Sequence, residues 1–207
     1  MYFVGKGVPK DFEEAAKWYR KATPKKTGKE WMRDGPSNGT DVAWLRKAAL
    51  QGHDRAQNRL AEIYERGAGI PQSMKESLKW YGRAANQGND LAQFNLARLL
   101  EASGASEEAL GWYHKSGEQG NLLAQVELGN RYQSGIHQDD EQAFKWFRLA
   151  AEHGHSSAQY HLGLMYRNGR GVPVDLQEAI LWLHRSAEQD HLPAIGALQK
   201  LEHSLKV

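Results

Sequence analysis

The chain repeats one pattern of residues along its length, and this repetition limits the folds it can adopt more than any other feature. Residues 165–182 read MYRNGRGVPVDLQEAILW, and residues 1–18 read MYFVGKGVPKDFEEAAKW. A third copy, residues 63–80, reads IYERGAGIPQSMKESLKW. Self-similarity of this kind is typical of proteins that stack one supersecondary unit. We therefore expect an array of repeated modules, each packed on its neighbours.

Each module is predicted to hold two helices. Tryptophans mark the period, because Trp44 is followed at intervals of 36, 32, 34 and 36 residues by Trp80, Trp112, Trp146 and Trp182. Apolar residues recur three and four apart, which is the spacing of an amphipathic helix, and strand-type alternation is absent from the sequence. First helices should begin near residues 54, 90, 123 and 157, and second helices near residues 73, 106, 139 and 175.

Local signals support these boundaries. A capping box places Ser, Thr or Asp three residues before Glu or Gln, and the pattern begins at Asp11, Asp54, Ser73, Asp90, Ser156 and Asp175. Glycines that favour a left-handed backbone follow the second helices at Gly52, Gly88, Gly120 and Gly154, and Asp190 takes this place in the last repeat. Gly129 and Gly163 fall inside first helices, where we expect a close approach of the neighbouring helix.

We expect one solenoid domain over residues 1–207. It would contain a partial repeat without its first helix (1–22), a degenerate repeat with a shortened helix and a basic loop (23–52), four regular repeats (53–88, 89–120, 121–154 and 155–190) and a C-terminal capping helix (191–207). In that helix Leu192, Ile195, Leu198 and Leu201 should point inward. The helix of the partial repeat would have an uncovered flank, through which the chain could self-associate.

The motif Ala-x-x-x-Leu-Gly-x-x-Tyr-x-x-Gly-x-Gly-Val-Pro-x-Asp-x-x-x-Ala-x-x-Trp, carried by residues 158–182, resembles the Sel1-like repeat family. The resemblance covers the whole chain except roughly residues 23–40. It implies an all-α, right-handed α-solenoid (superhelix) of stacked antiparallel helix pairs, related to tetratricopeptide repeats and possessing a concave face. It also implies a non-enzymatic scaffold or adaptor for another protein. The alternative implied function is an immunity-type inhibitor that neutralises a secreted, lipase-like toxin.

Composition excludes several other classes. The net charge of +2 is small, so no global field favours nucleic acid or anionic lipid. No apolar run approaches the ~18 residues of a membrane-spanning helix, and we expect no membrane insertion. The chain has no cysteine, which rules out disulfides but leaves the compartment open. The sequence is therefore compatible with a soluble protein of either the cytoplasm or the periplasm.

The predicted partner-binding surface is the inner face of the first helices. By analogy with tetratricopeptide packing, it would carry residues spaced three and four apart on each helix: Arg55, Asn58, Glu62, Glu65, Phe94, Arg98, Glu101, Val126, Asn130, Gln133, Tyr160, Leu164 and Arg167. Phe94, Val126 and Tyr160 hold equivalent positions and would align as an apolar strip that suits a bound peptide or helix. Alternatively, the strip packs between adjacent first helices.

A second candidate surface is the basic segment near the N-terminus, where Lys26, Lys29, Trp31 and Arg33 could meet an acidic partner. Trp31 would be either a binding anchor or a core residue of the shortened helix. We expect no metal, no cofactor and no catalytic residue. His153 and His155 provide two imidazoles where a zinc site needs three or four ligands, and carboxylate pairs such as Asp139 and Asp140 are better explained as helix caps.

Overall fold

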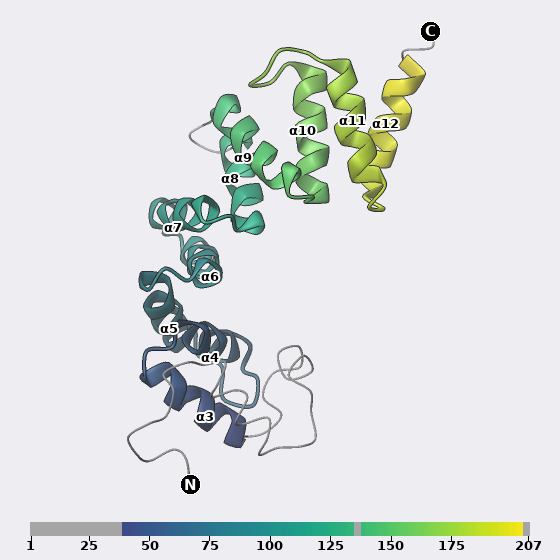
Figure 1. The fold of residues 1–207 in the computed structure, drawn as a ribbon. Coiled ribbons are helices and arrows are strands. Elements are labelled where there is room, and N and C mark those ends of the chain that lie inside the picture. Colours follow the sequence, from purple (N-terminus) through teal and green to yellow (C-terminus); the bar gives the residue numbers. More distant parts are fainter. Residues whose placement is uncertain (1–38, 135–137, 205–207) are drawn as a thin grey trace. The chain divides into compact units, whose positions relative to one another are not determined.

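A computed structural model of the chain describes residues 39–134 and 138–204. Every regular element in these two ranges is an α-helix, which confirms the all-α prediction for the described residues (Figure 1). The helices are α3 (Gly39–Leu50), α4 (Asp54–Arg66), α5 (Met74–Asn86), α6 (Asp90–Ala102), α7 (Ser106–Glu118), α8 (Leu122–Ser134), α9 (Asp140–Glu152), α10 (Ser156–Asn168), α11 (Leu176–Ala187) and α12 (Leu192–Ser204).

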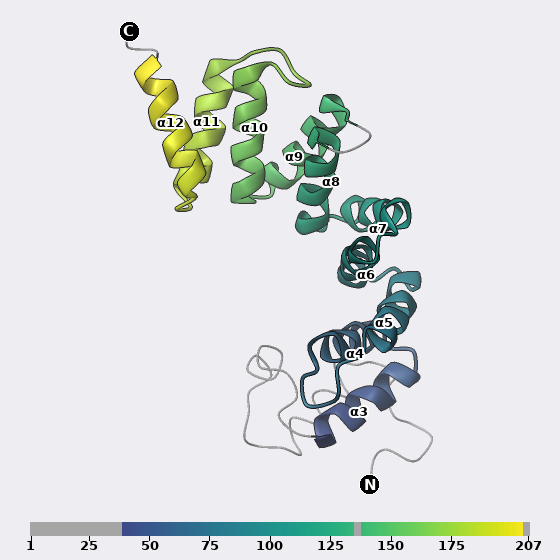
Figure 2. The ribbon, with the colours of Figure 1, turned by 180° about the vertical axis from the view of Figure 1, so that it is seen from behind.

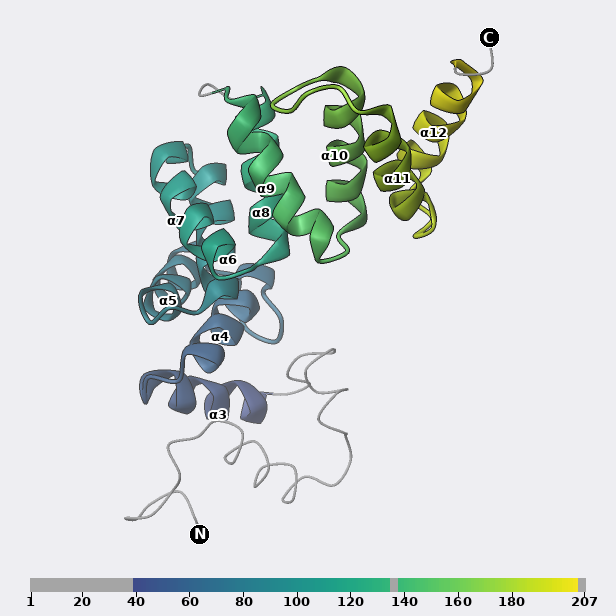
Figure 3. The same cartoon turned by 45° about the horizontal axis from the view of Figure 1, so that its top comes forward.

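The chain divides into two compact units, Met1–Leu99 and Leu100–Val207. In the first unit, α3 packs on α4 and α4 packs on α5 (Figure 2). In the second unit, each helix from α7 to α11 packs on the helix that follows it, so α11 lies between α10 and α12 (Figure 3). The predicted partial repeat (1–22), its uncovered flank and the shortened helix lie outside the described residues.

The predicted helix starts agree with the structure to within one residue, because local caps determine them. The Ser73 hydroxyl accepts a hydrogen bond from the amide of Glu76 at 3.3 Å. A carboxylate oxygen of Asp139 accepts two backbone amides at the start of α9, each at 3.0 Å. Asp175 does the same at the start of α11, at 2.9 and 3.0 Å. These three caps are confirmed, and each satisfies amides that the helix leaves without a partner.

The capping boxes predicted at Asp54, Asp90 and Ser156 are wrong by one residue. These three are the first residues of their helices, and the residue before each occupies the cap. Asn89, for example, accepts the amide of Ala92 through its side-chain oxygen at 2.8 Å. An acidic residue in the first turn, such as Asp54 or Asp90, also interacts favourably with the helix dipole, and sequence spacing alone does not separate this role from capping.

The glutamines of those three predicted boxes, and Gln125 at the equivalent position of α8, have a different role. Each donates its side-chain amide to a carbonyl near the end of the preceding helix, across a buried interface. The pairs are Gln57 to Ala49 at 3.0 Å, Gln93 to Ala85 at 3.1 Å, Gln125 to Gly117 at 3.0 Å and Gln159 to Ala151 at 3.2 Å. Each of these carbonyls also accepts the amide of the glycine that ends its helix, so the recurrent glutamine bond adds a second donor and ties one repeat to the next.

The predicted helix stops are confirmed. Gly52, Gly88, Gly120 and Gly154 all have a positive φ, between 85° and 95°. Asp190 adopts the left-handed region with a φ of 59°, which a residue with a side chain rarely does.

The close approach predicted at the helix-interior glycines is also confirmed. A Cβ atom at Gly129 would lie 2.6 Å from the ring of Phe147, and one at Gly163 would lie 2.8 Å from Leu183 Cγ. Both distances are shorter than van der Waals contact, so α8 and α9, and likewise α10 and α11, pack with no room for a side chain at these positions.

The loop between α10 and α11 docks on the start of α9. A Cβ at Gly171 would meet the carbonyl oxygen of Asp140 at 2.1 Å, and Gly171 has a φ of 68°. The neighbouring Arg170 forms an ion pair with the Asp140 carboxylate at 2.7 Å and donates to the carbonyl of Gln133 at 3.2 Å. The Gly-x-Gly-Val-Pro motif between α10 and α11 therefore forms a loop that packs against residues of the preceding repeat.

The C-terminal helix differs in part from its prediction. Leu201 is buried, and Ile195 and Leu198 are half-buried, but Leu192 is 77% exposed, so its predicted inward orientation is wrong. Leu192 is the first residue of α12, and the buried contact with α11 is made instead by Ala194 in the same cluster as Leu183 and Leu201.

Candidate partner-binding surface

We call the thirteen predicted contact residues on α4, α6, α8 and α10 the first-helix face. On α4 this face is a polar network rather than a free surface. Asn58 donates to Glu62 at 3.1 Å and accepts from Asn95 of α6 at 3.3 Å. Arg59 forms an ion pair with the same Glu62. Asn58 is 7% exposed, so it has little surface to offer a partner, and its contacts hold α4 against α6.

Glu65 performs a similar task one turn further along α4. Its carboxylate accepts a hydrogen bond from the Tyr81 hydroxyl at 2.9 Å and forms an ion pair with Arg98 of α6. Burial, followed by the charge of Glu65, raises the pKa of Tyr81 above its ordinary value, so the phenol stays protonated and donates. Glu65 and Arg98 thus join three helices of the first unit, while Arg98 keeps an exposed side chain beside Phe94 on α6.

Glu101 repeats this arrangement within the second unit. It accepts from the Tyr113 hydroxyl at 3.1 Å and pairs with Arg131, whose guanidinium also lies over the Tyr113 ring at 4.8 Å. Glu127 lies 3.6 Å from the same arginine. Burial raises the pKa of Glu127, and the charge of Arg131 opposes that shift. Arg131 was missed by the sequence reasoning, because its position is held by a buried apolar residue, Leu99, one repeat earlier.

The apolar members of the face in the second unit are half-buried. Val126 packs against the core cluster that contains Phe147 and Leu162. Tyr160 and Leu164 pack against the cluster that contains Leu183 and Leu201. Both predicted readings therefore have a physical basis here, because these side chains contact neighbouring helices and also retain part of their surface.

The remaining members lie at the edges of the network. Arg55 has an exposed side chain, and Phe94, Asn130, Gln133 and Arg167 are half-buried. The Asn130 carbonyl accepts from Ser134 at 3.0 Å, and Arg167 donates to Asn168 at 3.0 Å. The second predicted surface, Lys26, Lys29, Trp31 and Arg33, lies outside the described residues.

Two exposed leucines extend this face and were missed by the sequence reasoning. Leu91 in the first turn of α6 is 51% exposed, and Leu123 in the first turn of α8 is 52% exposed. Each lies three residues before an apolar member of the face, Phe94 or Val126, and therefore on the same side of its helix. The signal was available in the sequence, because both leucines occupy the repeat position that Arg55 holds on α4. Each helix thus presents an apolar pair one turn apart.

The described residues contain no group of three His, Asp or Glu side chains arranged to hold a metal ion. In the same part of the chain, no helix combines the length and the apolar character that crossing a bilayer requires. The side chains assembled on the first-helix face are amides, ion pairs and half-buried apolar groups. Such a mixture is typical of protein–protein contact surfaces, where a partly apolar centre is surrounded by polar groups.

Comparison with known proteins identifies the family. A family model for the Sel1 repeat matches residues 1–23, 42–53, 54–89, 90–121, 122–155 and 156–191. The chain therefore belongs to the Sel1 repeat family, whose members generally mediate protein–protein interaction and are typically non-catalytic. No curated protein matches the sequence significantly.

Two solved structures support the same fold. A Sel1 repeat protein from Oxalobacter formigenes is 33% identical, with a TM-score of 0.79. A protective antigen of uropathogenic Escherichia coli strains, described as displaying an SLR fold, is 30% identical, with a TM-score of 0.51. Each match covers 97% of this chain, which spans 63% and 54% of the two relatives. The fold is thus an α-solenoid of Sel1 repeats.

Proposed function

We propose that the chain is a non-enzymatic scaffold or adaptor that binds another protein through its first-helix face, extended by Leu91 and Leu123. The observation that carries the proposal is the exposure of these two leucines, each above half, beside an apolar residue one turn away. Burying a leucine side chain contributes about 1.5–3 kcal/mol, so such pairs are natural anchors for an apolar partner segment.

The polar members of the face support binding in a second way. Glu62, Glu65 and Arg98 are already held by hydrogen bonds and ion pairs within the first unit. A surface whose side chains are ordered before binding loses less conformational entropy when a partner arrives. The network therefore holds the charged side chains of α4 and α6 in a fixed arrangement on the same face as Phe94 and Leu91. We infer that apolar side chains of the partner pack on each of these pairs, beside the polar residues of the same helix.

The test uses three forms of the chain as bait for proteins from the native host, with mass spectrometry to identify what each retains. The forms are the natural sequence, the double variant Leu91→Gln/Leu123→Gln, and the control variant Leu181→Gln. Leu181 is 42% exposed on the second helix α11, so the control removes a comparable apolar side chain away from the first-helix face. Glutamine keeps a good helix propensity, and all three should fold alike.

A specific partner should be retained by the natural chain and by Leu181→Gln, and its affinity for the double variant should fall by roughly tenfold or more. Equal retention by the double variant would contradict the proposal and direct attention to Lys26, Lys29, Trp31 and Arg33. The immunity-type alternative stays a prediction from the sequence. It would be favoured if the captured partner were a single hydrolase whose activity falls when the chain is added.

A further inference from the structure

The residue that caps each first helix is either asparagine or histidine, and the two differ in how they respond to acid. Asn89 and Asn121 accept amides of their own helices at 2.8 and 3.1 Å. At the start of α10, the imidazole Nδ1 of His155 accepts the amide of Ala158 at 3.5 Å. An amide oxygen accepts at any physiological pH, whereas an imidazole nitrogen accepts only when it carries no proton. The cap of α4 is also a histidine, His53, but its side chain makes no cap hydrogen bond, so among the caps that accept an amide through their side chain that of α10 is the acid-sensitive one.

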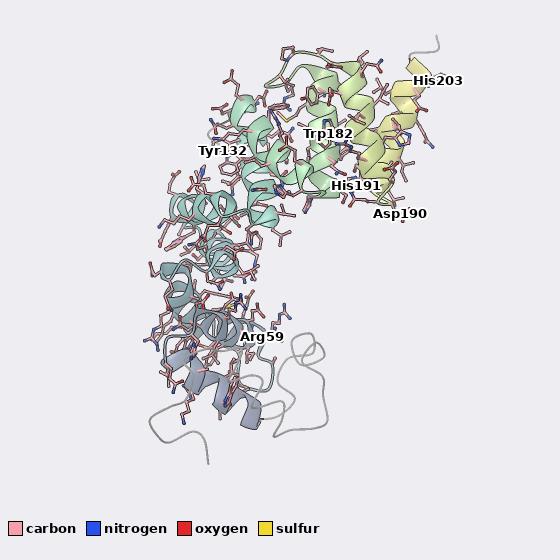
Figure 4. All side chains as sticks on the ribbon, viewed as in Figure 1. Arg59, Tyr132, Trp182, Asp190, His191 and His203 are labelled. Carbon is pink, nitrogen blue, oxygen red and sulfur yellow. The ribbon has the colours of Figure 1, made fainter. Side chains whose placement is uncertain are left out.

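Two further histidines lie on α10 and at the turn before α12. The His161 ring on α10 stacks on Phe147 of α9, with 4.6 Å between centroids and 7° between planes. Tyr160 links this pair to the start of α12, because its ring centroid lies 5.3 Å from His161 and 5.2 Å from His191. His191 is at the turn before α12 (Figure 4), and its Nδ1 atom is buried without a hydrogen-bond partner among the described residues.

The surroundings of this cluster offer little to balance added positive charge. Burial is the main cause that lowers the pKa of both His155 and His161, and the charge of His191 lowers both further, with no carboxylate opposing either shift. The charged groups near the facing ends of the packed helices have other partners or are exposed. On α9, Arg148 pairs with Glu152 at 2.8 Å. At the end of α11, His184 lies 3.8 Å from Glu188, and Arg185 lies over the Trp182 ring. Asp190, before α12, is exposed.

We propose that His155 and His161 form an acid-sensitive latch, which holds α10 against α9 while the two rings are neutral and loosens it when they take up protons. Protonation of His155 removes the acceptor for the Ala158 amide and puts a positive charge at a helix N-terminus, where the helix dipole is unfavourable to it. Burial of the His161 ring disfavours a charge on it, so its protonation also weakens the packed arrangement of α10 on α9.

The direction of the pH effect follows from the lowered pKa values. An opened or unfolded segment has histidines with the ordinary value of 6.5, whereas the latched form binds protons only at lower pH. Above pH 6.5 the histidines are neutral in both the latched and the opened form, and the latch is at full strength. As the pH falls below 6.5, the opened form gains protons first, so the latch weakens until the lowered pKa values are passed. The asparagine-capped helices α6 and α8 lack this response at their caps.

Hydrogen exchange followed by mass spectrometry tests the latch on the full chain, with rates corrected for the intrinsic effect of pH. Between about pH 7.5 and about pH 5, the first turns of α10 should lose protection by up to about tenfold for each unit by which the pKa values are lowered. The first turns of α6 and α8 should keep their protection from hydrogen exchange over the same pH range. His155→Asn, which copies the cap of the equivalent helices, should reduce the loss at α10, and His155→Asn/His161→Asn should reduce it further.

The reverse exchange provides the matched control. Asn121→His should make the start of α8 acid-sensitive, while His203→Asn, at the exposed end of α12, should leave the response of α10 unchanged. An equal loss of protection in α8 and α10 of the natural chain would overturn the proposal, and so would a His155→Asn variant that remains as acid-sensitive as the natural chain. If a variant fails to fold, an NMR titration of the natural chain decides, because His155 or His161 titrating at or above 6.5 contradicts the latch.

Discussion

The helix pairs α4/α5 and α8/α9 fill equivalent space in two different ways. At the point where the helices face each other, α5 carries Tyr81 and α9 carries Phe147, and both rings are fully buried. In α4 the repeat position that Gly129 holds in α8 is occupied by Ala61, and the Tyr81 hydroxyl donates to Glu65 at 2.9 Å. Opposite Phe147 the first helix has Gly129, whose absent side chain lets the ring approach its backbone.

The other pairs follow the same division. Tyr113 of α7 donates to Glu101 at 3.1 Å, as Tyr81 does to Glu65. Leu183 of α11 lies against Gly163, as Phe147 does against Gly129. A buried hydroxyl needs an acceptor, and the carboxylate supplies it; an apolar side chain has no such need and packs closer when the opposing residue is glycine. The residue types at these positions therefore depend on one another.

Gly129→Ala should have the largest effect of the changes that test this comparison. The added methyl group would collide with a ring that is itself stacked on His161, so the core must shift, at a cost of about 1–3 kcal/mol in the free energy of unfolding. Urea unfolding followed by circular dichroism measures it. Gly82→Ala is the matched control, because a Cβ there meets nothing within 4 Å, and alanine should stabilise that helix by up to about 1 kcal/mol. Stabilisation by both changes would refute the close approach.

Tyr81→Phe should come next, with a loss of about 1–2 kcal/mol, because it removes a buried hydrogen bond to a charged acceptor. Unfolding of this variant, of Glu65→Gln and of the double variant forms a double-mutant cycle at neutral pH. We expect a coupling above about 0.5 kcal/mol, since the two groups are in direct contact. Strictly additive losses would mean that the hydroxyl and the carboxylate do not stabilise one another.

Ala61→Gly should have the smallest effect on the free energy of unfolding. We expect a loss of about 1 kcal/mol, the difference in helix propensity, because Tyr81 keeps its hydrogen bond to Glu65. The combination Ala61→Gly/Tyr81→Phe copies the α8/α9 pattern into α4/α5. Because the phenyl ring is then free to approach the glycine, the pair should cost less than the sum of the two single changes, as measured by the shift of the urea midpoint. A combined cost equal to or above the sum would show that the two patterns are not interchangeable.

The helices could be predicted from the sequence because their ends are defined locally. Ser73 and Asp175 at the starts, and glycines such as Gly88 at the ends, act through hydrogen bonds and backbone angles within a few residues. The cap at α4 could not be placed in the same way. Asp54 in the first turn and His53 before it are both compatible with the pattern, and the role of Gln57 depends on a carbonyl of another helix.

The candidate surface was predictable in position but not in exposure. Helical spacing places Asn58, Glu62 and Glu65 on one side of α4, and the structure agrees. Whether such a residue is accessible depends on the neighbouring helix, which covers Asn58 with Asn95 and engages Glu65 with Arg98. Leu91 was overlooked for the opposite reason, because an apolar residue in a repeat is assumed to be core until its neighbours are known.

The buried bond from Gln125 to the Gly117 carbonyl has a consequence for how such chains can gain or lose modules. The donor belongs to one module and the acceptor to the module before it. A deletion that ends inside a module and removes the acceptor would leave the buried glutamine amide without its partner, whereas a deletion of one complete period brings the next glutamine to an equivalent carbonyl. Shortening or lengthening this chain by recombination should therefore be tolerated in steps of a full module, wherever the two break points fall in register.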